Sequence, residues 1–393
     1  MTTPDTHTPP RLPWDSADPY PFYETLRRNA DIVWDDTAQA WLILGYHAAR
    51  TVLTDKSWTS DPRANRAINA DTVLNSAVID ANMLFADGPT HHRLRSAVRD
   101  VFSRSFIDGL HTGVDAICHD VISAIPAGKP FDFMSQIALP LPIAVIGAWM
   151  ELDAEQCTSL REHSPAIIRL LGGLTDEDDI ASGIAASAAL IADLLPAAAD
   201  RRAHPGDDLL SFLAADPTLS LDEVVITALL VAVAGHETTA NLLGAGLIRL
   251  LTPSPDGNRP ADYIDASDPA VCTELLRLDA PVQATARTAT ADQTIAGVDI
   301  ACGEAVLVCI AAANRDPAIY AEPNQFHPGR PGPAPLSFGH GAHYCLGAPL
   351  ARLETSTALH HILARKPELV GTATWRDTAA IRGPLRAPAV LTQ

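Results

Sequence analysis

The segment from Ser220 to Leu251, SLDEVVITALLVAVAGHETTANLLGAGLIRLL, limits the possible folds more than any other part of the chain. Ser220 followed three residues later by Glu223 is a capping box, so a helix begins there. At 1.5 Å per residue this helix would be about 45 Å long, enough to cross a whole domain. It is apolar on all sides, which indicates a helix buried at the centre of a protein.

A membrane-spanning helix would have a similar composition. However, His236 and Glu237 lie at the middle of this segment, and a charge at the middle of a bilayer costs at least about 3 kcal/mol. The buried central helix is therefore the favoured interpretation. A carboxylate buried in such a helix is expensive unless it is paired, so Glu237 belongs to a structural ion pair, has a raised pKa or handles protons.

Composition narrows the classes of partner. The chain has 393 residues, with 28 basic and 47 acidic side chains and a formal charge of -19. That charge argues against nucleic acid and anionic membranes as general partners. The six cysteines form no close CxxC pairs, so a zinc site or a disulfide framework is disfavoured. Residues 1–15 lack the basic and apolar regions of a signal peptide, which predicts a flexible arm on a cytoplasmic protein.

A second informative segment, FGHGAHYCLG, runs from Phe338 to Gly347 and contains Cys345. Its glycines allow positive φ angles and the close approach of a flat ligand. Apolar residues at helical spacing follow, with Pro349 early enough for a first turn, so a helix begins just after Cys345. Amides at a helix N-terminus favour a thiolate, which is a good anionic metal ligand. Inert packing is the alternative for a lone cysteine.

Phe338, Gly341, Cys345 and Gly347 fit the pattern F-x-x-G-x-x-x-C-x-G, and here the chain resembles the cytochrome P450 monooxygenases. The resemblance implies that Cys345 is the axial ligand of a haem b iron, with Phe338, Gly339 and Gly347 beside the cofactor. A thiolate ligand favours O–O cleavage. The implied fold is mainly α with a minor β-region, a single domain over residues 1–393, with the haem between the long central helix and the Cys345 loop.

The middle of the long helix, Ala234-Gly235-His236-Glu237-Thr238, matches the A/G-G-x-D/E-T segment of the same family. The resemblance implies that Ala234 and Gly235 let the backbone approach the distal face of the haem. It also implies that Thr238 binds dioxygen and water while Glu237 relays protons, since dioxygen cleavage consumes two protons. Thr239 is the nearest alternative for the alcohol.

His91 and Arg95 are four residues apart on an expected helix, so both could reach one anion. A solvated helix face is the alternative. Their match to the family's H-x-x-x-R segment, followed by FSRSF, implies that they hold haem propionates together with Arg287 and His343. A shift of one residue would give the role of His91 to His92.

Glu274 and Arg277 are three residues apart on another expected helix. A surface pair of this kind would contribute only about 0.5 kcal/mol. The two residues match the family's E-x-x-R segment, which implies a buried network with a later arginine. Arg330 is the expected third member, and the three residues are assigned to stability rather than catalysis.

The substrate site is the least constrained part of the prediction. The resemblance places residues 60–84 and 164–190 over the substrate chamber, with a surface loop and core packing as the respective alternatives. The tail around residues 381–388 would fold back as a hairpin over the same cavity, or form a plain surface turn. Expected substrate contacts are Leu230, Val233, Gln283, Ala284 and Thr285.

The implied reaction uses O2 and two external electrons to hydroxylate or epoxidise a small organic molecule, a secondary metabolite. No Gly-rich dinucleotide fingerprint is present, so a ferredoxin or flavodoxin with its NAD(P)H reductase would supply electrons to a monomeric enzyme, near arginines such as Arg352. Oxidative coupling or desaturation without oxygen insertion remains an alternative. A haem-binding sensor or carrier is another, and peroxide-driven catalysis a third; Glu237 and Thr238 argue against these two.

Overall fold

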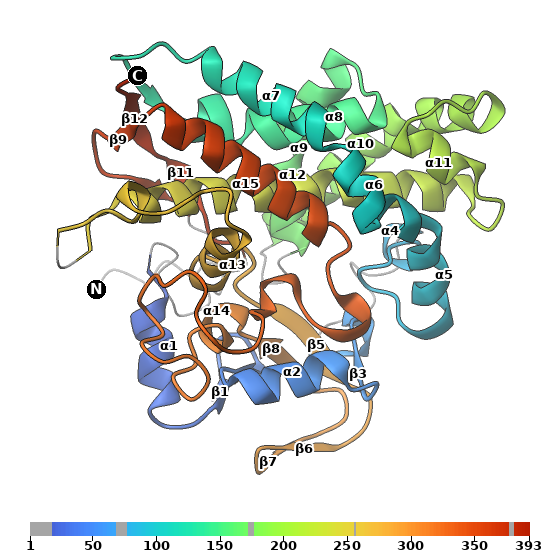
Figure 1. Ribbon diagram of the computed structural model, residues 1–393. Coiled ribbons are helices and arrows are strands. Elements are labelled where there is room, and N and C mark those ends of the chain that lie inside the picture. Colours follow the sequence, from blue (N-terminus) through green and yellow to red (C-terminus); the bar gives the residue numbers. More distant parts are fainter. Residues whose placement is uncertain (1–17, 68–76, 172–176, 255–256, 377–380) are drawn as a thin grey trace, which may run out of the picture.

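The structure is a computed structural model that describes residues 18–67, 77–171, 177–254, 257–376 and 381–393. The predicted arm at residues 1–15 lies outside the described residues. Figure 1 shows a helical upper part around α12 and a lower part that holds the largest sheet. The fold is mainly helical with small sheets, as predicted. The α-helices are α1 (Tyr20–Arg27), α2 (Tyr46–Thr54), α4 (Ala77–Asp80), α5 (Gly88–Arg99), α6 (Arg104–Gly109), α7 (His111–Ser123), α8 (Pro140–Met150), α9 (Ala154–Leu171), α10 (Glu177–Ala203), α11 (Leu209–Ala215), α12 (Leu221–Leu251), α13 (Pro269–Leu278), α14 (Ile310–Ala313) and α15 (Ala348–Ala364).

The predicted central helix is confirmed as α12, and both halves of its capping box are present. Ser220 Oγ accepts a hydrogen bond from the Glu223 amide, and Glu223 Oε2 accepts one from the Ser220 amide at 2.8 Å. Helices α8, α9, α10 and α15 pack against α12. Most of its side chains are buried because these four helices cover an apolar surface that runs around the helix.

Two helices among the described residues are long and apolar enough to cross a membrane by length and composition, Asp178–Ala203 and Leu221–Leu251. In the second, 67% of the most apolar window is buried inside the protein. The core position of α12 agrees with the interpretation drawn from His236 and Glu237. In the first helix, which belongs to α10, 28% of the most apolar window is buried. Helix α10 packs along α9 and α12.

The largest sheet joins distant parts of the chain in the order β1-β2-β8-β5-β3. Strand β2 pairs in parallel with β8, and the other neighbours are antiparallel. Ile43 and Val308 belong to one core cluster and Leu42 and Leu307 to another. Successive side chains of a strand point to opposite faces, so this sheet is covered on both sides.

Three smaller sheets complete the β-region, in the orders β4-β12-β9, β10-β11 and β6-β7. A C-terminal hairpin is present as β10 and β11, beginning at Thr374 rather than near residue 381, and its place over a substrate cavity stays a prediction. The strands are β1 (Ile32–Asp35), β2 (Ala40–Ile43), β3 (Trp58–Thr59), β4 (Pro130–Asp132), β5 (Thr285–Ala289), β6 (Gln293–Ile295), β7 (Val298–Ile300), β8 (Ala305–Val308), β9 (Pro367–Leu369), β10 (Thr374–Trp375), β11 (Pro384–Arg386) and β12 (Pro388–Leu391).

Candidate active site

The Cys345 loop connects the lower part of the molecule to α15 (Figure 1). The Cys345 amide donates to the Phe338 carbonyl at 2.8 Å, which closes the loop. Gly339 and Gly341 have φ angles of +71° and +72°, a region that side chains rarely adopt. A β-carbon at Gly341 would lie 2.6 Å from the Leu53 carbonyl oxygen. The loop therefore needs glycine at position 341 for its backbone conformation and for its contact with α2.

Two properties of Cys345 describe its surroundings. Its side chain is exposed, yet burial by the surrounding protein raises the pKa of the thiol. The amides of Gly347 and Ala348 and the Arg95 guanidinium act in the opposite direction. The two amides and Arg95 therefore favour the thiolate, as expected, but burial has the larger effect and favours the thiol. A bound cation would be needed to make the thiolate the preferred form.

Two half-buried arginines lie near this loop without an acidic partner among the described residues. Arg95 donates to the Tyr344 carbonyl, and Arg287 donates to Thr285 Oγ1 at 3.1 Å and to the Ala286 carbonyl at 2.6 Å. Burial lowers the pKa of both guanidinium groups, although Asp87 is close enough to Arg287, and Cys345 to Arg95, to oppose this in part. A buried cation without an anion is costly, so these residues form a suitable environment for a negatively charged group.

His91 and His343 stack with their ring centroids 4.2 Å apart, so the structure brings together two of the expected anion-binding residues. Burial, then His343 and Arg95, lower the pKa of His91 to about 4. His92 is exposed. Asp87, which the sequence analysis did not identify, contacts His343 Nε2 at 2.9 Å. Although burial opposes it, hydrogen bonds from His343 and Thr59 lower the pKa of Asp87 to about 2.

Gly235, Thr238 and Thr239 of α12 lie in different surroundings. A β-carbon at Gly235 would lie 3.2 Å from Ile146 of α8, so this glycine permits close packing of two helices. Thr238 is half-buried and donates from Oγ1 to the Ala234 carbonyl at 2.7 Å. Thr239, the alternative residue for this role, is buried, with 2% of its surface exposed. Of the two hydroxyls, the one at Thr238 is better placed to meet a ligand.

Glu237 is fully buried and pairs with Arg376, which follows β10. Arg376 Nη1 donates to Glu237 Oε2 at 2.7 Å. Sequence analysis missed Arg376, because the C-terminal tail has no pattern that marks one arginine over another. The signal available was the helix itself, since a carboxylate in an apolar core requires a cation from elsewhere in the chain.

His236 is also fully buried, and neither ring nitrogen has a hydrogen-bond partner of normal geometry. Burial, and to a smaller extent Arg376 and Arg161, lower the pKa of His236 to about 3, although the Leu139 backbone lies close enough to oppose this. Asn241, one turn after Glu237, has two unpartnered amide atoms. Together with Glu237 and Arg376 these residues form what we call the Glu237 pocket.

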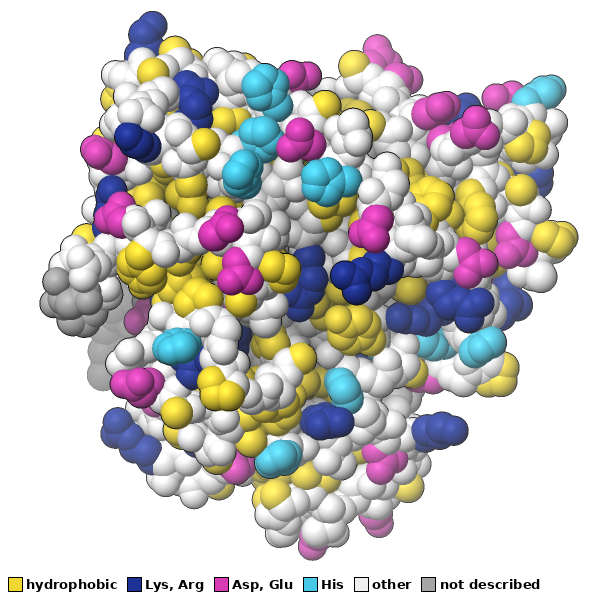
Figure 2. Space-filling model, viewed as in Figure 1, with side chains coloured by type: hydrophobic (Ala, Val, Ile, Leu, Met, Phe, Trp, Pro, Cys, Tyr) yellow, Lys and Arg dark blue, Asp and Glu magenta, His cyan; other side chains and the backbone are white. Residues whose placement is uncertain are grey.

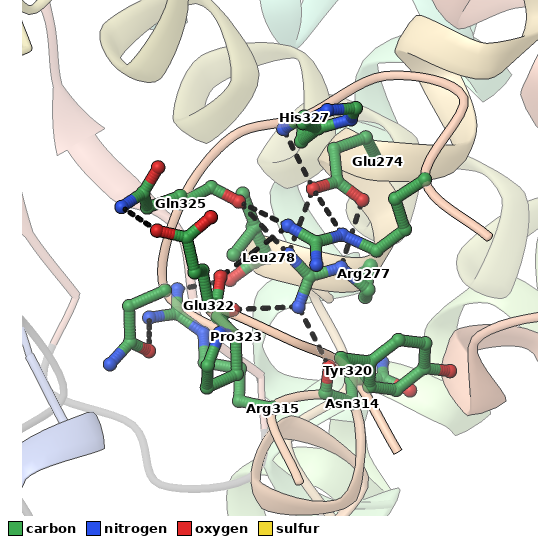
Figure 3. A network of polar contacts seen from close by, with 12 residues as sticks. Glu274, Arg277, Leu278, Asn314, Arg315, Tyr320, Glu322, Pro323, Gln325 and His327 are labelled. Carbon is green, nitrogen blue, oxygen red and sulfur yellow. Dashed lines mark hydrogen bonds and ion pairs between the residues drawn. The ribbon is translucent and has the colours of Figure 1, made fainter. Parts of the chain in front are cut away.

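The structure brings the three predicted stability residues together. Glu274 accepts from Arg277 Nε and Nη2, each at 2.8 Å, and from Arg330 Nε at 3.1 Å. Arg277 also donates to the carbonyls of Asn314 and Pro323 (Figure 3). This set, which we call the Glu274 network, joins α13 to two later loops.

The expected substrate contacts occupy different environments. Val233 and Gln283 are buried, at 0% and 1% exposure, and Val233 belongs to the main core. Leu230, Ala284 and Thr285 are half-buried. Gln283 Nε2 donates to the Ala280 carbonyl at 2.6 Å.

No group of three or more His, Cys, Asp or Glu side chains within the described parts of the chain is arranged to hold a metal ion. A metal held by Cys345 must therefore bring its remaining ligands with it, as the iron of a haem does.

Comparison with known proteins decides the family. A model of the family described as Cytochrome P450 matches residues 269–365. The chain is 34% identical over 388 residues to the cytochrome P450 monooxygenase PikC of Streptomyces venezuelae, covering 94% of this chain and 90% of that protein. The chain belongs to the cytochrome P450 family. The P450 named 6-deoxyerythronolide B hydroxylase, from Saccharopolyspora erythraea, is 32% identical, covering 96% of this chain and 97% of that protein.

A solved P450 structure extends the comparison to the fold. P450BioI, crystallised with an acyl carrier protein that carries a fatty acid, superposes with a TM-score of 0.89 at 29% identity, covering 96% of this chain and 99% of that one. This P450 is therefore a monooxygenase that acts on a small molecule, and its family uses haem and dioxygen. The residues present fit a haem, because the Cys345 side chain is accessible and Arg95 and Arg287 supply charge for propionates.

Proposed function

We propose that this P450 binds haem b through the Cys345 thiolate and oxidises a small organic molecule of secondary metabolism by hydroxylation or epoxidation. The observation that carries the proposal is the setting of Cys345. Its sulfur is accessible, has no co-ligands from the described residues and lies close to Arg95. Neither Arg95 nor Arg287 forms an ion pair with an acidic side chain among the described residues. Such a site suits a metal that arrives in an anionic macrocycle.

Four side chains would bind the two propionates. Arg95 and Arg287 would supply permanent charge, and His91 and His343 would add contacts from their rings, that of His343 from Nδ1 because its Nε2 already contacts Asp87. Asp87 fixes the ring of His343 through its contact with Nε2. Phe338, Gly339 and Gly347 would shape the loop beside the cofactor, and Ala234 would keep α12 narrow on the opposite side, whereas Gly235 packs against Ile146 of α8.

The bound haem would supply the dioxygen-activating chemistry of the family. The chain itself supplies proton handling on α12. The Thr238 hydroxyl, now bonded to the Ala234 carbonyl, can turn to a ligand by rotation about one bond. Glu237 Oε1 has no partner, so it can accept a proton from water and pass it on.

We further propose that the chain forms a single domain, acts as a monomer in the cytoplasm without membrane attachment, and receives electrons from a ferredoxin or flavodoxin with its NAD(P)H reductase. Figure 2 shows Lys and Arg side chains in a band across the middle of one face, between the N-terminal end of α15 and α5. Arg104 is exposed and suits an acidic partner, as does the exposed Arg99, although Asp100 lies 3.4 Å from its Nε. Arg352 is engaged instead, with Thr273 Oγ1 at 2.8 Å.

The test is the absorption spectrum of the reduced, carbon monoxide-treated protein. We expect the red-shifted Soret band of thiolate ligation in the wild type and in Cys302→Ala, which removes an exposed cysteine elsewhere. Cys345→Ala should abolish the band, because no other sulfur can replace it. A Cys345→Ala protein with an unchanged band would disprove the assignment. A screen for ligand-induced spin-state change would then narrow the substrate class.

A further inference from the structure

The Glu237 pocket lies where the C-terminal hairpin meets the central helix. Arg376 comes from the end of the chain and reaches Glu237 across a separation of 139 residues. The Glu237 side chain is 0% exposed and that of Arg376 is 16% exposed. An ion pair with so little solvent has a fixed geometry, since neither group can exchange its partner for water without moving.

The hairpin holds Arg376 firmly against α12. The Arg376 amide donates to the Gly383 carbonyl at 3.0 Å. A β-carbon at Gly383 would lie 2.0 Å from Asn241 Oδ1, so only glycine lets the hairpin approach the helix this closely. Beside it, Trp375 packs against the Arg382 guanidinium, 3.9 Å from its ring centroid.

The pair is incompletely satisfied on both sides. Glu237 Oε1 and Arg376 Nε are buried without a hydrogen-bond partner. Within the described ranges, Arg376 is the only arginine or lysine at ion-pair distance from Glu237, and His236 Nδ1, 3.9 Å away, belongs to a ring whose low pKa keeps it neutral. One oxygen of Glu237 is therefore anchored to a cation while the other is available.

We propose that Arg376 is a positioning residue for Glu237, holding the carboxylate charged through Oε2 so that Oε1 takes up and passes on protons. This inference rests on the proposed proton-handling role of Glu237. Without Arg376 the carboxylate would be buried and unpaired, and such a group takes up a proton and keeps it at neutral pH. A carboxyl that stays protonated cannot collect the next proton from solvent.

The first measurement is the fraction of electrons that ends in product, as a function of pH. In Arg376→Gln we expect about a tenfold loss at pH 7, recovered at higher pH as Glu237 ionises. Arg386→Gln is the matched control, because it removes the same charge from the exposed side of the same hairpin and should match the wild type. Arg376→Lys retains the charge and should restore the wild-type pH profile.

The second measurement does not depend on turnover. Infrared difference spectra between low and high pH should show one additional protonated carboxyl band in Arg376→Gln, absent from the double variant with Glu237→Gln. Glu354, whose pKa burial raises well above its usual range, is common to all variants and cancels. If Arg376→Gln does not fold, Arg376→Lys carries the test alone.

Each outcome decides one claim. A wild-type pH profile and no added carboxyl band in Arg376→Gln would overturn the role of Arg376, as would an Arg376→Lys enzyme with an altered pH profile. Full coupling in Glu237→Gln would instead overturn the proposed function of Glu237, whatever the arginine variants do.

Discussion

The Glu274 network and the Glu237 pocket are both buried carboxylates paired with arginine, yet they differ in how completely their polar atoms are used. Both oxygens of Glu274 accept hydrogen bonds, and Arg277 donates from all three of its nitrogens. Figure 3 shows these bonds converging from α13 and the loops that follow α14. In the Glu237 pocket, six buried atoms of four residues have no partner, on His236, Glu237, Asn241 and Arg376.

The number of polar atoms without a partner indicates a different role for each of the two sites. A saturated network cannot accept a proton or a water without losing a bond, so it rigidifies the loops that it joins. In the Glu237 pocket, polar atoms that lack hydrogen-bond partners can bind water or a ligand without first breaking a bond within the protein. We propose that the same residue types serve stability in the Glu274 network and proton handling in the Glu237 pocket.

The largest expected effect comes from breaking the saturated network. Glu274→Gln leaves the buried Arg277 without its counter-charge, and we expect the free energy of unfolding to fall by about 3 to 5 kcal/mol, as is typical for removing one partner of a buried pair. Urea unfolding measures it. Glu368→Gln makes the same chemical change at an exposed position and should alter the free energy little; equal losses in the two variants would remove the distinction drawn here.

A smaller effect is expected from pH in the Glu237 pocket. The pKa of His236 is about 3 in the folded protein and about 6.5 in an unfolded chain. Because the folded state disfavours the proton, stability is lost as pH falls below 6.5. Between pH 7 and pH 5 the loss from this residue should be about 2 kcal/mol. His236→Asn, which does not titrate, should lack this component of the pH dependence; identical pH slopes would refute the prediction.

The smallest effect is expected at Asn241. Its amide forms no hydrogen bond in the structure, so Asn241→Leu, close in shape, removes no protein contact of that kind. We expect the free energy of unfolding to change by no more than about 1 kcal/mol. Calorimetry or urea unfolding checks this. A loss as large as that of Glu274→Gln would mean that the two sites are equally integrated into the fold.

Sequence patterns predicted the parts of the molecule that local rules govern. Ser220 and Glu223 marked the start of α12 because a capping box needs only residues three apart. The glycines around Cys345 marked a tight loop for a similar reason, and Gly339 and Gly341 do have positive φ. The contact between Glu274 and Arg277 also follows from helical spacing, whereas the burial of the pair and the addition of Arg330 required the family resemblance.

Contacts between distant segments could not be predicted in this way. Arg376 is in a tail that also contains Arg382 and Arg386. Arg382 is buried as well and pairs with Asp279, and no local spacing shows which arginine of the tail reaches Glu237. Asp87 precedes α5 as an ordinary turn residue, although its partner His343 is 256 residues away. Such pairings depend on how strands and helices pack, which single-sequence periodicity does not encode.

The parallel pairing of β2 with β8 affects how the chain is made. Residues 40–43 emerge from the ribosome early, but their partners at 305–308 are synthesised only after most of the helical part. Until then β2 has β1 alone beside it, and its other edge is open to any strand that arrives. Long-range pairing of this kind slows folding, so nascent or truncated chains that end before residue 305 are the forms that chaperones must shield from aggregation.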